Sequence, residues 1–427
     1  MTMDRRRFLS GAAALAAALG TAGGLTACGG GRLQASPDRL SLFTYLDATQ
    51  APLLDQVLDS FRDESGVTVR HDTLPGSGAA LFPDKVRTQM LGARPPDLFM
   101  MWGGQIAAPF IDAGQIAALD EVYARHGWDE LLNPAAVRDM TFDGHRYGLP
   151  GVIANLGCWY RTDLFERAGV SVPASYDELE DACDRIVASG VVPLATGGVY
   201  GWDPMRLFEY LLEITAGPEL HDRLLVGEAS WDRAEVRDAF GLFRKWVERK
   251  WVPEGFLGIT PDVADSYLTQ GTGAFLITGQ WQEYTNNASG LDPELFGTFV
   301  LPTGHDVVRT SGWTEGFFLS RASPNGGNAA RLFDFLLTPP AQETFAGFRT
   351  PLRDLAPDPG ELPLNARWLE LGRRHPHYVI QDQAFPKDVS DAYFQIQSDI
   401  AQDNVSPRDA AARMQDAVTT WKEGQVR

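Results

Sequence analysis

Four of the eleven tryptophans stand where an apolar stretch gives way to small or polar residues. They are Trp102 in MMWGGQ, Trp202 in TGGVYGWDP, Trp281 in FLITGQWQEY and Trp313 in TSGWTEGFF. At such positions a strand delivers a side chain to the edge of a sheet, where open α/β sheets bind ligands. A flat aromatic ring can cover the C–H face of a sugar. The pattern predicts an aromatic sugar site, with core packing as the alternative for any single ring.

Polar side chains that could bind sugar hydroxyls stand near these rings in the sequence. They are Gln105, Asp203, Gln280 and Glu315, together with Tyr45 and Asp47 after the first expected strand and Asn155 in GVIANLGCWY. Carboxylates and amides provide the hydrogen bonds that hydroxyls need, and charged acceptors make the stronger ones. We therefore add these residues to the predicted ligand site, with a solvated loop position as the alternative for each.

Motifs for catalysis are missing from the sequence. The chain has no HExxH, GxSxG or GxxxxGK[ST] motif, and no GxGxxG in a strand–turn–helix setting. Three cysteines exclude a multi-cysteine metal site. We predict a protein that is not an enzyme and has no catalytic residue, no metal and no cofactor. The abundant carboxylates leave a glycosidase open as an alternative.

The first residues have the order of an export signal. Arg5, Arg6 and Arg7 precede Phe8 and a run of small apolar residues, which resembles a twin-arginine signal. The following LTAC resembles a bacterial lipobox, whose cysteine is lipidated. We expect residues 1–27 to be removed, Cys28 to carry a lipid, and residues 28–38 to form a flexible tether. The mature protein is then expected outside the cell, anchored to the outer face of the cytoplasmic membrane.

Length and charge limit the remaining possibilities. With 427 residues the chain is long enough for two or three domains. Its formal net charge of −19 repels phosphate backbones, so nucleic acid is not expected as a partner. Cys158 and Cys183 could form a disulfide outside the cell, and the sequence leaves this open.

Strand and helix patterns alternate along the mature chain. Apolar strands are predicted at 40–45, 67–69 and 97–101, separated by helices from about 51 and over 79–92. A capping box at Ser175–Glu178 opens a predicted helix over 176–189, and a strand follows near 191–194. Further helices are predicted near 205–216, 233–250, 262–270, 327–337 and 407–422. This alternation predicts an α/β fold of two lobes, with one large barrel as the alternative.

Several stretches resemble the carbohydrate-binding cluster of the extracellular solute-binding proteins of bacterial ABC importers, typified by maltodextrin- and raffinose-type binding proteins. The stretches are LSLFTYLD, RPPDLFMMW, YGLPGVIANLGCWYRTDLFERAGVSVPASYDELEDAC, GTGAFLITGQWQ, GWTEGFFLSRASPNGGNAARLFDFLLTPPAQETFA and SDIAQDNVSPRDAAARMQDAV. They occur in the family's order over nearly the whole mature chain. Two positions depart from the pattern: Arg161 stands where the family usually has Asn, and Asp47 lies in a loop that is usually small.

The resemblance implies a periplasmic-binding-protein-like fold. Each lobe would be a mostly parallel sheet flanked by helices, and a multi-crossover hinge would join them. Residues 39–150 plus 310–350 would form lobe 1, and residues 151–309 plus 351–427 would form lobe 2. A sugar or oligosaccharide would bind between the lobes, contacting the four tryptophans, and the protein, expected as a monomer, would deliver it to an ABC permease.

Two alternatives to the sugar-importer function stay open. The same fold could bind a non-sugar solute, and a charged one would require arginines in the cleft, for which Arg349 and Arg353 are the candidates. A cell-surface glycosidase is the other alternative.

Overall fold

The computed structural model describes residues 36–46, 50–74, 81–92, 94–360 and 362–425, all of which belong to one compact unit, residues 35–427. The predicted signal over 1–27, the lipidated Cys28 and the site residue Asp47 lie outside the described residues. The end of the range predicted as a flexible tether is held in place. The Ser36 amide donates to Asn325 Oδ1 at 2.8 Å, and Asn328 Nδ2 donates to the carbonyl oxygen of Pro37 at 3.2 Å.

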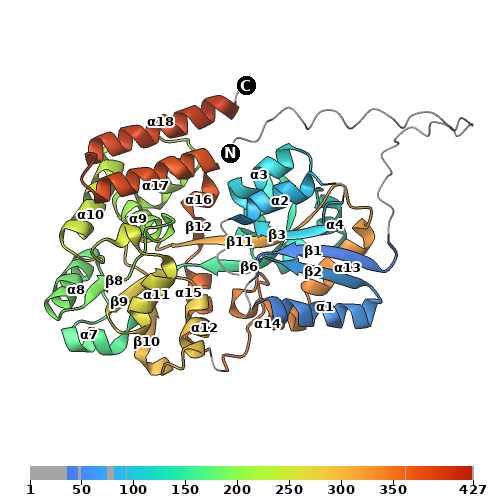
Figure 1. Ribbon diagram of the computed structural model, residues 1–427, viewed down its shortest axis with the longest axis horizontal. Helices are drawn as coiled ribbons and strands as arrows, with labels where there is room; N and C mark the ends of the chain where they lie inside the picture. The colour runs from blue at the N-terminus through green and yellow to red at the C-terminus, as the bar shows by residue number, and fades with distance from the viewer. Residues whose placement is uncertain (1–35, 47–49, 75–80, 93, 361, 426–427) are drawn as a thin grey trace, which may run out of the picture. The chain divides into compact units, whose positions relative to one another are not determined.

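One sheet contains six strands in the order β12-β11-β3-β1-β2, with β6 also paired to β11. These strands are β1 (Arg39–Thr44), β2 (Thr68–Thr73), β3 (Leu98–Trp102), β6 (Gly148–Asn155), β11 (Thr310–Leu319) and β12 (His377–Val379). Strands β1, β2 and β3 pair in parallel, whereas β11 runs antiparallel to both β3 and β6 (Figure 1). Strand β3 is buried on both faces, because Leu98 and Met100 belong to one hydrophobic cluster and Phe99 and Met101 to another.

A second sheet contains four strands in the order β10-β7-β9-β8. They are β7 (Gly157–Arg161), β8 (Val192–Leu194), β9 (Gly273–Thr278) and β10 (Phe296–Phe299). Strand β7 is antiparallel to both of its neighbours, and only β8 and β9 pair in parallel. Both sheets are therefore mixed, and the prediction of mostly parallel sheets was wrong for the second. The reason is that β7 enters the second sheet directly from β6 of the first sheet, so no crossover helix within the second sheet brings it parallel to β9 or β10.

The chain passes between the two sheets at identifiable strands. Strand β6 ends at Asn155 in the first sheet, and β7 begins two residues later in the second. Strand β10 ends the second sheet at Phe299, and β11 re-enters the first sheet at Thr310. Strand β12 then pairs with the start of β11, although it lies within the range 351–427 that we predicted for lobe 2. The exact boundaries of the lobes stay a prediction.

Helices flank both sheets, and the eight that periodicity predicts begin within three residues of their predicted starts, whereas the others were not predicted. In the first part of the chain they are α1 (Ala51–Ser65), α2 (Phe82–Met90), α3 (Gly104–Asp112), α4 (Asp120–His126), α5 (Trp128–Leu131) and α6 (Pro134–Asp139), followed by the short hairpin of β4 (Thr141–Phe142) and β5 (His145–Arg146). Helix α1 buries Leu54, Val57, Leu58 and Phe61 on one face. It ends at Gly66, whose φ of 74° closes the helix in the left-handed region.

The later helices include the four that matter for the site: α9 (Trp202–Leu225), α11 (Pro261–Thr269), α12 (Trp281–Ala288) and α16 (Gln381–Ala384). The others are α7 (Thr162–Ala168), α8 (Tyr176–Ala188), α10 (Ala234–Glu248), α13 (Gly326–Leu336), α14 (Pro339–Phe345), α15 (Pro363–Arg374), α17 (Lys387–Ala401) and α18 (Pro407–Gln425). The predicted capping box exists at α8, where Ser175 Oγ accepts from the Glu178 amide at 3.2 Å. Helices α17 and α18 pack side by side (Figure 1). Cys158 and Cys183 are both buried and free.

Candidate ligand-binding site

The four singled-out tryptophans line one cavity. Its volume is about 280 Å³, near the lower end of the range for small-molecule sites. Its wall is formed by Trp102, Trp202, Trp281 and Trp313 together with Pro83, Ile106, Met205, Arg206, Ile380, Asp382 and Gln383. Six of the other seven tryptophans are fully buried in hydrophobic cores: Trp128, Trp159, Trp231, Trp246, Trp251 and Trp368. The sequence context of the tryptophans therefore distinguished those that line the cavity from those that pack in a hydrophobic core.

The rings reach the cavity from both sheets. Trp102 is the last residue of β3, and Trp313 lies near the start of β11 in the first sheet. Trp281 is the first residue of α12, shortly after β9 of the second sheet, and Trp202 is the first residue of α9. Only Trp102 and Trp281 thus follow a strand as predicted. Trp313 lies within a strand, and Trp202 opens a long helix.

Glycines precede two of these tryptophans at positions where a side chain would not fit. Gly201 precedes Trp202 with a φ of 78°, and a Cβ there would lie 2.5 Å from the Phe394 ring. A Cβ on Gly279 would lie 2.1 Å from the indole of Trp281. At such short distances only a residue without a Cβ atom fits. A glycine just before each of these helices therefore allows the chain to enter the helix that begins with a cavity tryptophan.

Two predicted site residues hold rings in place without lining the cavity. The Tyr45 ring stacks on that of Trp102, with centroids 4.3 Å apart. Glu315 Oε1 accepts a hydrogen bond of 3.0 Å from Trp313 Nε1. The Trp313 and Trp281 rings are tilted neighbours with centroids 5.8 Å apart. Tyr45 and Glu315 therefore support the aromatic wall from behind.

The charged part of the wall centres on Arg206. Its Nη1 donates to Asp203 Oδ1 at 2.8 Å and to the carbonyl oxygen of Ile277 at 3.2 Å. Its guanidinium lies 5.9 Å from the ring centroid of Trp281, within the range of a cation–π contact. Asp203 Oδ2 accepts from the Gly197 amide at 3.1 Å. Asp203 is therefore a buried anchor for Arg206, and not a cavity-lining residue as predicted.

Burial raises the pKa of several carboxyl groups near Arg206. It raises that of Asp382, which lines the cavity, to about 6, although Arg206 and the backbone amides of Asp382 and Gln383 oppose the rise. The pKa of Asp265 on α11 rises to about 7 because of burial and the nearby charge of Asp203. The pKa of Asp203 is also raised by burial, against the effect of Arg206. Each of these carboxyl groups therefore keeps its proton to a higher pH than a solvated carboxyl group does.

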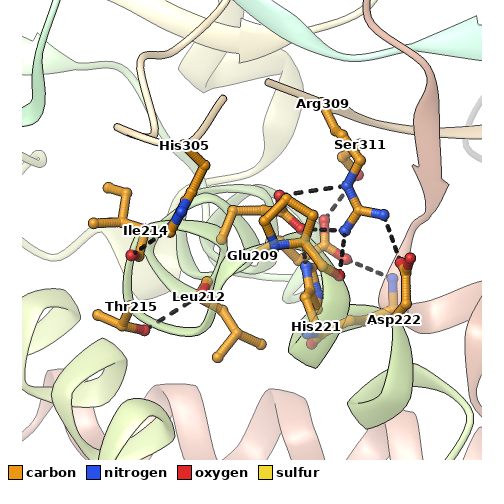
Figure 2. A network of polar contacts seen from close by, with 12 residues as sticks. Glu209, Leu212, Ile214, Thr215, His221, Asp222, His305, Arg309 and Ser311 are labelled. Carbon is orange, nitrogen blue, oxygen red and sulfur yellow. Dashed lines mark hydrogen bonds and ion pairs between the residues drawn. The ribbon is translucent and has the colours of Figure 1, made fainter. Parts of the chain in front are cut away.

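A buried polar network ties α9 to the strands that pass between the sheets (Figure 2). Glu209 Oε2 accepts from Ser311 Oγ at 2.8 Å, and Glu209 Oε1 accepts from the Gln381 amide at 2.5 Å. One turn further along α9, Glu213 Oε1 accepts from Arg309 Nη2 at 2.5 Å. Arg309 also donates to Asp222 at 2.6 Å. The helix that begins with Trp202 is therefore fixed to the starts of β11 and α16.

The remaining predicted residues are close to the site but do not line it. Gln105 is half-buried on α3, next to the lining residue Ile106. Gln280 is buried, and its Oε1 accepts from the Asn155 amide at 3.3 Å. The carbonyl oxygen of Asn155 accepts from Trp368 Nε1 at 3.2 Å. Asn155 and Gln280 thus link β6 to the chain before α12.

Sequence reasoning missed three polar cavity residues: Arg206, Asp382 and Gln383. Met205 and Arg206 follow Trp202 at helical spacing, three and four residues on, so they share its face of α9. That spacing could have identified them. No local signal marks Asp382 and Gln383, because α16 is positioned by the pairing of β12 with β11.

Neither a metal-binding cluster nor a membrane-spanning helix occurs in the part of the chain that the structure describes. No group of three or more His, Cys, Asp or Glu side chains is arranged to hold a metal ion. No helix there is long and apolar enough to cross a membrane.

The fold and the cavity define a class, an α/β binding protein with two sheets that share one aromatic site. The chain belongs to the family of bacterial extracellular solute-binding proteins, whose model matches residues 44–343. It is similar, at 23% identity over 371 residues, to an ABC transporter extracellular-binding protein of Pyrococcus horikoshii, covering 84% of this chain and 81% of the relative. This confirms the family resemblance seen in the sequence.

Two further comparisons describe the same likeness. A probable sugar-binding periplasmic protein of Rhizobium meliloti is 23% identical over 244 residues, 56% of this chain and 57% of that protein. A solved structure described as a chitin oligosaccharide binding protein superimposes with a TM-score of 0.78 at 23% identity, covering 90% of this chain and 98% of the other. The predicted two-lobed α/β fold is confirmed.

Proposed function

We propose that this protein captures a sugar or oligosaccharide in the tryptophan-lined cavity and delivers it to an ABC permease. The observation that carries the proposal is the convergence of four tryptophans from both sheets on one cavity that also contains Arg206, Asp382 and Gln383. Indole faces cover the apolar faces of a sugar ring, while a carboxylate, an amide and a guanidinium bind its hydroxyls.

The permease as partner is supported by the family and by the relatives. The family is that of extracellular solute-binding proteins, and the Pyrococcus relative is described as an ABC transporter component. Because the cavity wall comes from both sheets, a ligand that contacts both favours the arrangement in which they are closest. In this proposal the protein binds its ligand without chemical change, acts as a monomer and hinges at β6–β7 and at the residues before β11.

The proposal includes membrane attachment through residues outside the described part of the chain. Residues 1–27 direct export, Cys28 receives a lipid, and the following residues span the distance to Ser36. Mass spectrometry of the membrane fraction tests this part. A Cys28→Ala variant should lose the lipid mass and appear in the medium or the soluble extracellular fraction.

The placement of two arginines argues against a charged solute held by an arginine cluster. Neither Arg349 nor Arg353 lines the cavity. Arg353 donates to the carbonyl oxygen of Leu132 at 3.1 Å, which is a structural contact. Arg206 is thus the one arginine among the described cavity-lining residues, and Asp203 pairs with it.

Thermal unfolding of the full chain against mono- and oligosaccharides tests the proposal. A ligand at 100 times its Kd should stabilise the protein by about 2.7 kcal/mol. Stabilisation by a sugar, with no release of products from natural glycosides, supports binding without catalysis. Turnover of a glycoside would contradict it, and stabilisation only by peptides, polyols or anions would replace the sugar with another solute.

A further inference from the structure

The charges around the cavity do not balance. Arg206 is paired with Asp203 through a bond of 2.8 Å. Asp382 lines the same cavity, and its Oδ1 has no hydrogen-bond partner among the described residues. Asp265 adds a third carboxyl group that interacts electrostatically with Asp203 and Arg206. One guanidinium therefore compensates up to three carboxylates.

A second polar side chain of the wall lies next to Asp382 in the chain. Gln383 lines the cavity, and its amide can both donate and accept hydrogen bonds there. Buried polar groups are nearly always hydrogen-bonded. The unpartnered carboxylate oxygen of Asp382 therefore indicates a ligand that supplies a hydrogen-bond donor in this part of the cavity.

The aromatic part of the wall favours the same charge. The face of an indole carries negative electrostatic potential and attracts cations more strongly than the faces of the other aromatic residues do. The ring of Trp281 already faces the guanidinium of Arg206 at 5.9 Å. Three further indoles line the cavity. The indole rings and the carboxylates near the cavity thus both favour a ligand with a positively charged group.

We propose that the preferred ligand of this cavity is a sugar that carries a protonated amino group, with the ammonium bound beside Asp382. The inference rests on the proposed function and specifies its ligand class. A neutral sugar can bind the rings but leaves the negative charge uncompensated. N-acetylation removes the positive charge and one donor, so it should remove the preference.

Isothermal titration at pH 7 with matched sets of sugars tests the inference. The amines are glucosamine, galactosamine, mannosamine and the disaccharide chitobiose in its deacetylated form. Each is compared with its N-acetylated form and with its neutral parent, with cellobiose as the parent of the disaccharide. We expect at least one amine to bind at least tenfold more tightly than both of its counterparts.

Two variants distinguish the effect of the Asp382 carboxylate from the effect of the protein's net charge. Asp382→Asn keeps the shape of the side chain, and it should reduce the affinity for the amine about tenfold while changing that for the neutral parent less than twofold. Asp388→Asn removes the same charge from an exposed position at the start of α17, outside the cavity. It should leave both affinities unchanged. A general loss of structure would lower both affinities equally, so the difference between ligands identifies the specific role.

Each outcome decides the inference. An amine preference that is lost in Asp382→Asn and kept in Asp388→Asn supports it. Equal or tighter binding of neutral or N-acetylated sugars overturns it and leaves the proposed function intact. Binding of no sugar in any set overturns the inference and contradicts the proposed function as well.

Discussion

Replacing Trp281 by alanine tests the aromatic wall directly. Its indole lines the cavity, contacts the ring of Trp313 with a centroid separation of 5.8 Å, and faces the guanidinium of Arg206 at 5.9 Å. Loss of one stacking surface costs about 1–3 kcal/mol, by analogy with stacked bases. Since about 1.4 kcal/mol corresponds to a factor of ten, we expect the Kd for the bound sugar to rise roughly 5- to 150-fold.

The fold should tolerate this change because Trp281 is only partly buried and belongs to the wall of a cavity rather than to the centre of a core. Trp421 on α18 provides the matched control. Its ring is also partly buried and packs edge-on against Phe385 with centroids 5.6 Å apart, away from the cavity. Trp421→Ala should lower the stability and leave the Kd unchanged.

The assay is isothermal titration with the sugar that gives the largest thermal shift, alongside circular dichroism to verify folding. An unchanged Kd in a folded Trp281→Ala variant would remove this ring from the site. An equal increase in Kd for both variants would show that the effect is one of stability, and it would refute the argument from the cavity wall.

Three further predictions concern the buried interior. Burial raises the pKa of Glu209 from 4.5 to about 8, so its contribution to stability is fully present below pH 4.5 and is lost as the pH rises through about 8. Glu209→Gln should flatten the pH dependence of urea unfolding over this interval. Arg309→Met removes one of the two side chains that pair with the buried Glu213, the other being His221, and should cost up to about 3 kcal/mol, part of which Glu213→Gln should restore. Trp246→Ala empties a fully buried core position and should cost about 3–5 kcal/mol in urea unfolding without changing the Kd.

Local sequence patterns identified eight of the helices and four of the strands that the structure describes. Apolar periodicity, a capping box and terminal glycines predicted helices such as α1 and α8 to within a few residues, because these signals act within one or two turns. The four cavity tryptophans were also recognisable from their neighbours. Each stands at the end of an apolar stretch beside small or polar residues, although Trp202 and Trp281 turned out to be the first residues of helices.

The polar half of the site depended on contacts between distant segments. Asp203, Gln280 and Glu315 were selected as neighbours of tryptophans, but neighbours in a strand or at a helix start point in different directions, and these three side chains support the wall rather than line it. Asp382 reaches the cavity only because β12 pairs with β11 and thereby places α16 beside α9.

The sequence by itself determined the family, the approximate positions of the most strongly periodic helices and the aromatic chemistry of the site. Each of these depends on residue types and short spacings. The tertiary structure decided the mixed sheets, the charge around Arg206 and the unpartnered oxygen of Asp382. Strand pairing and the packing of helices on sheets bring together residues that lie far apart in the chain. A local sequence pattern therefore cannot specify which carboxyl group forms an ion pair with an arginine.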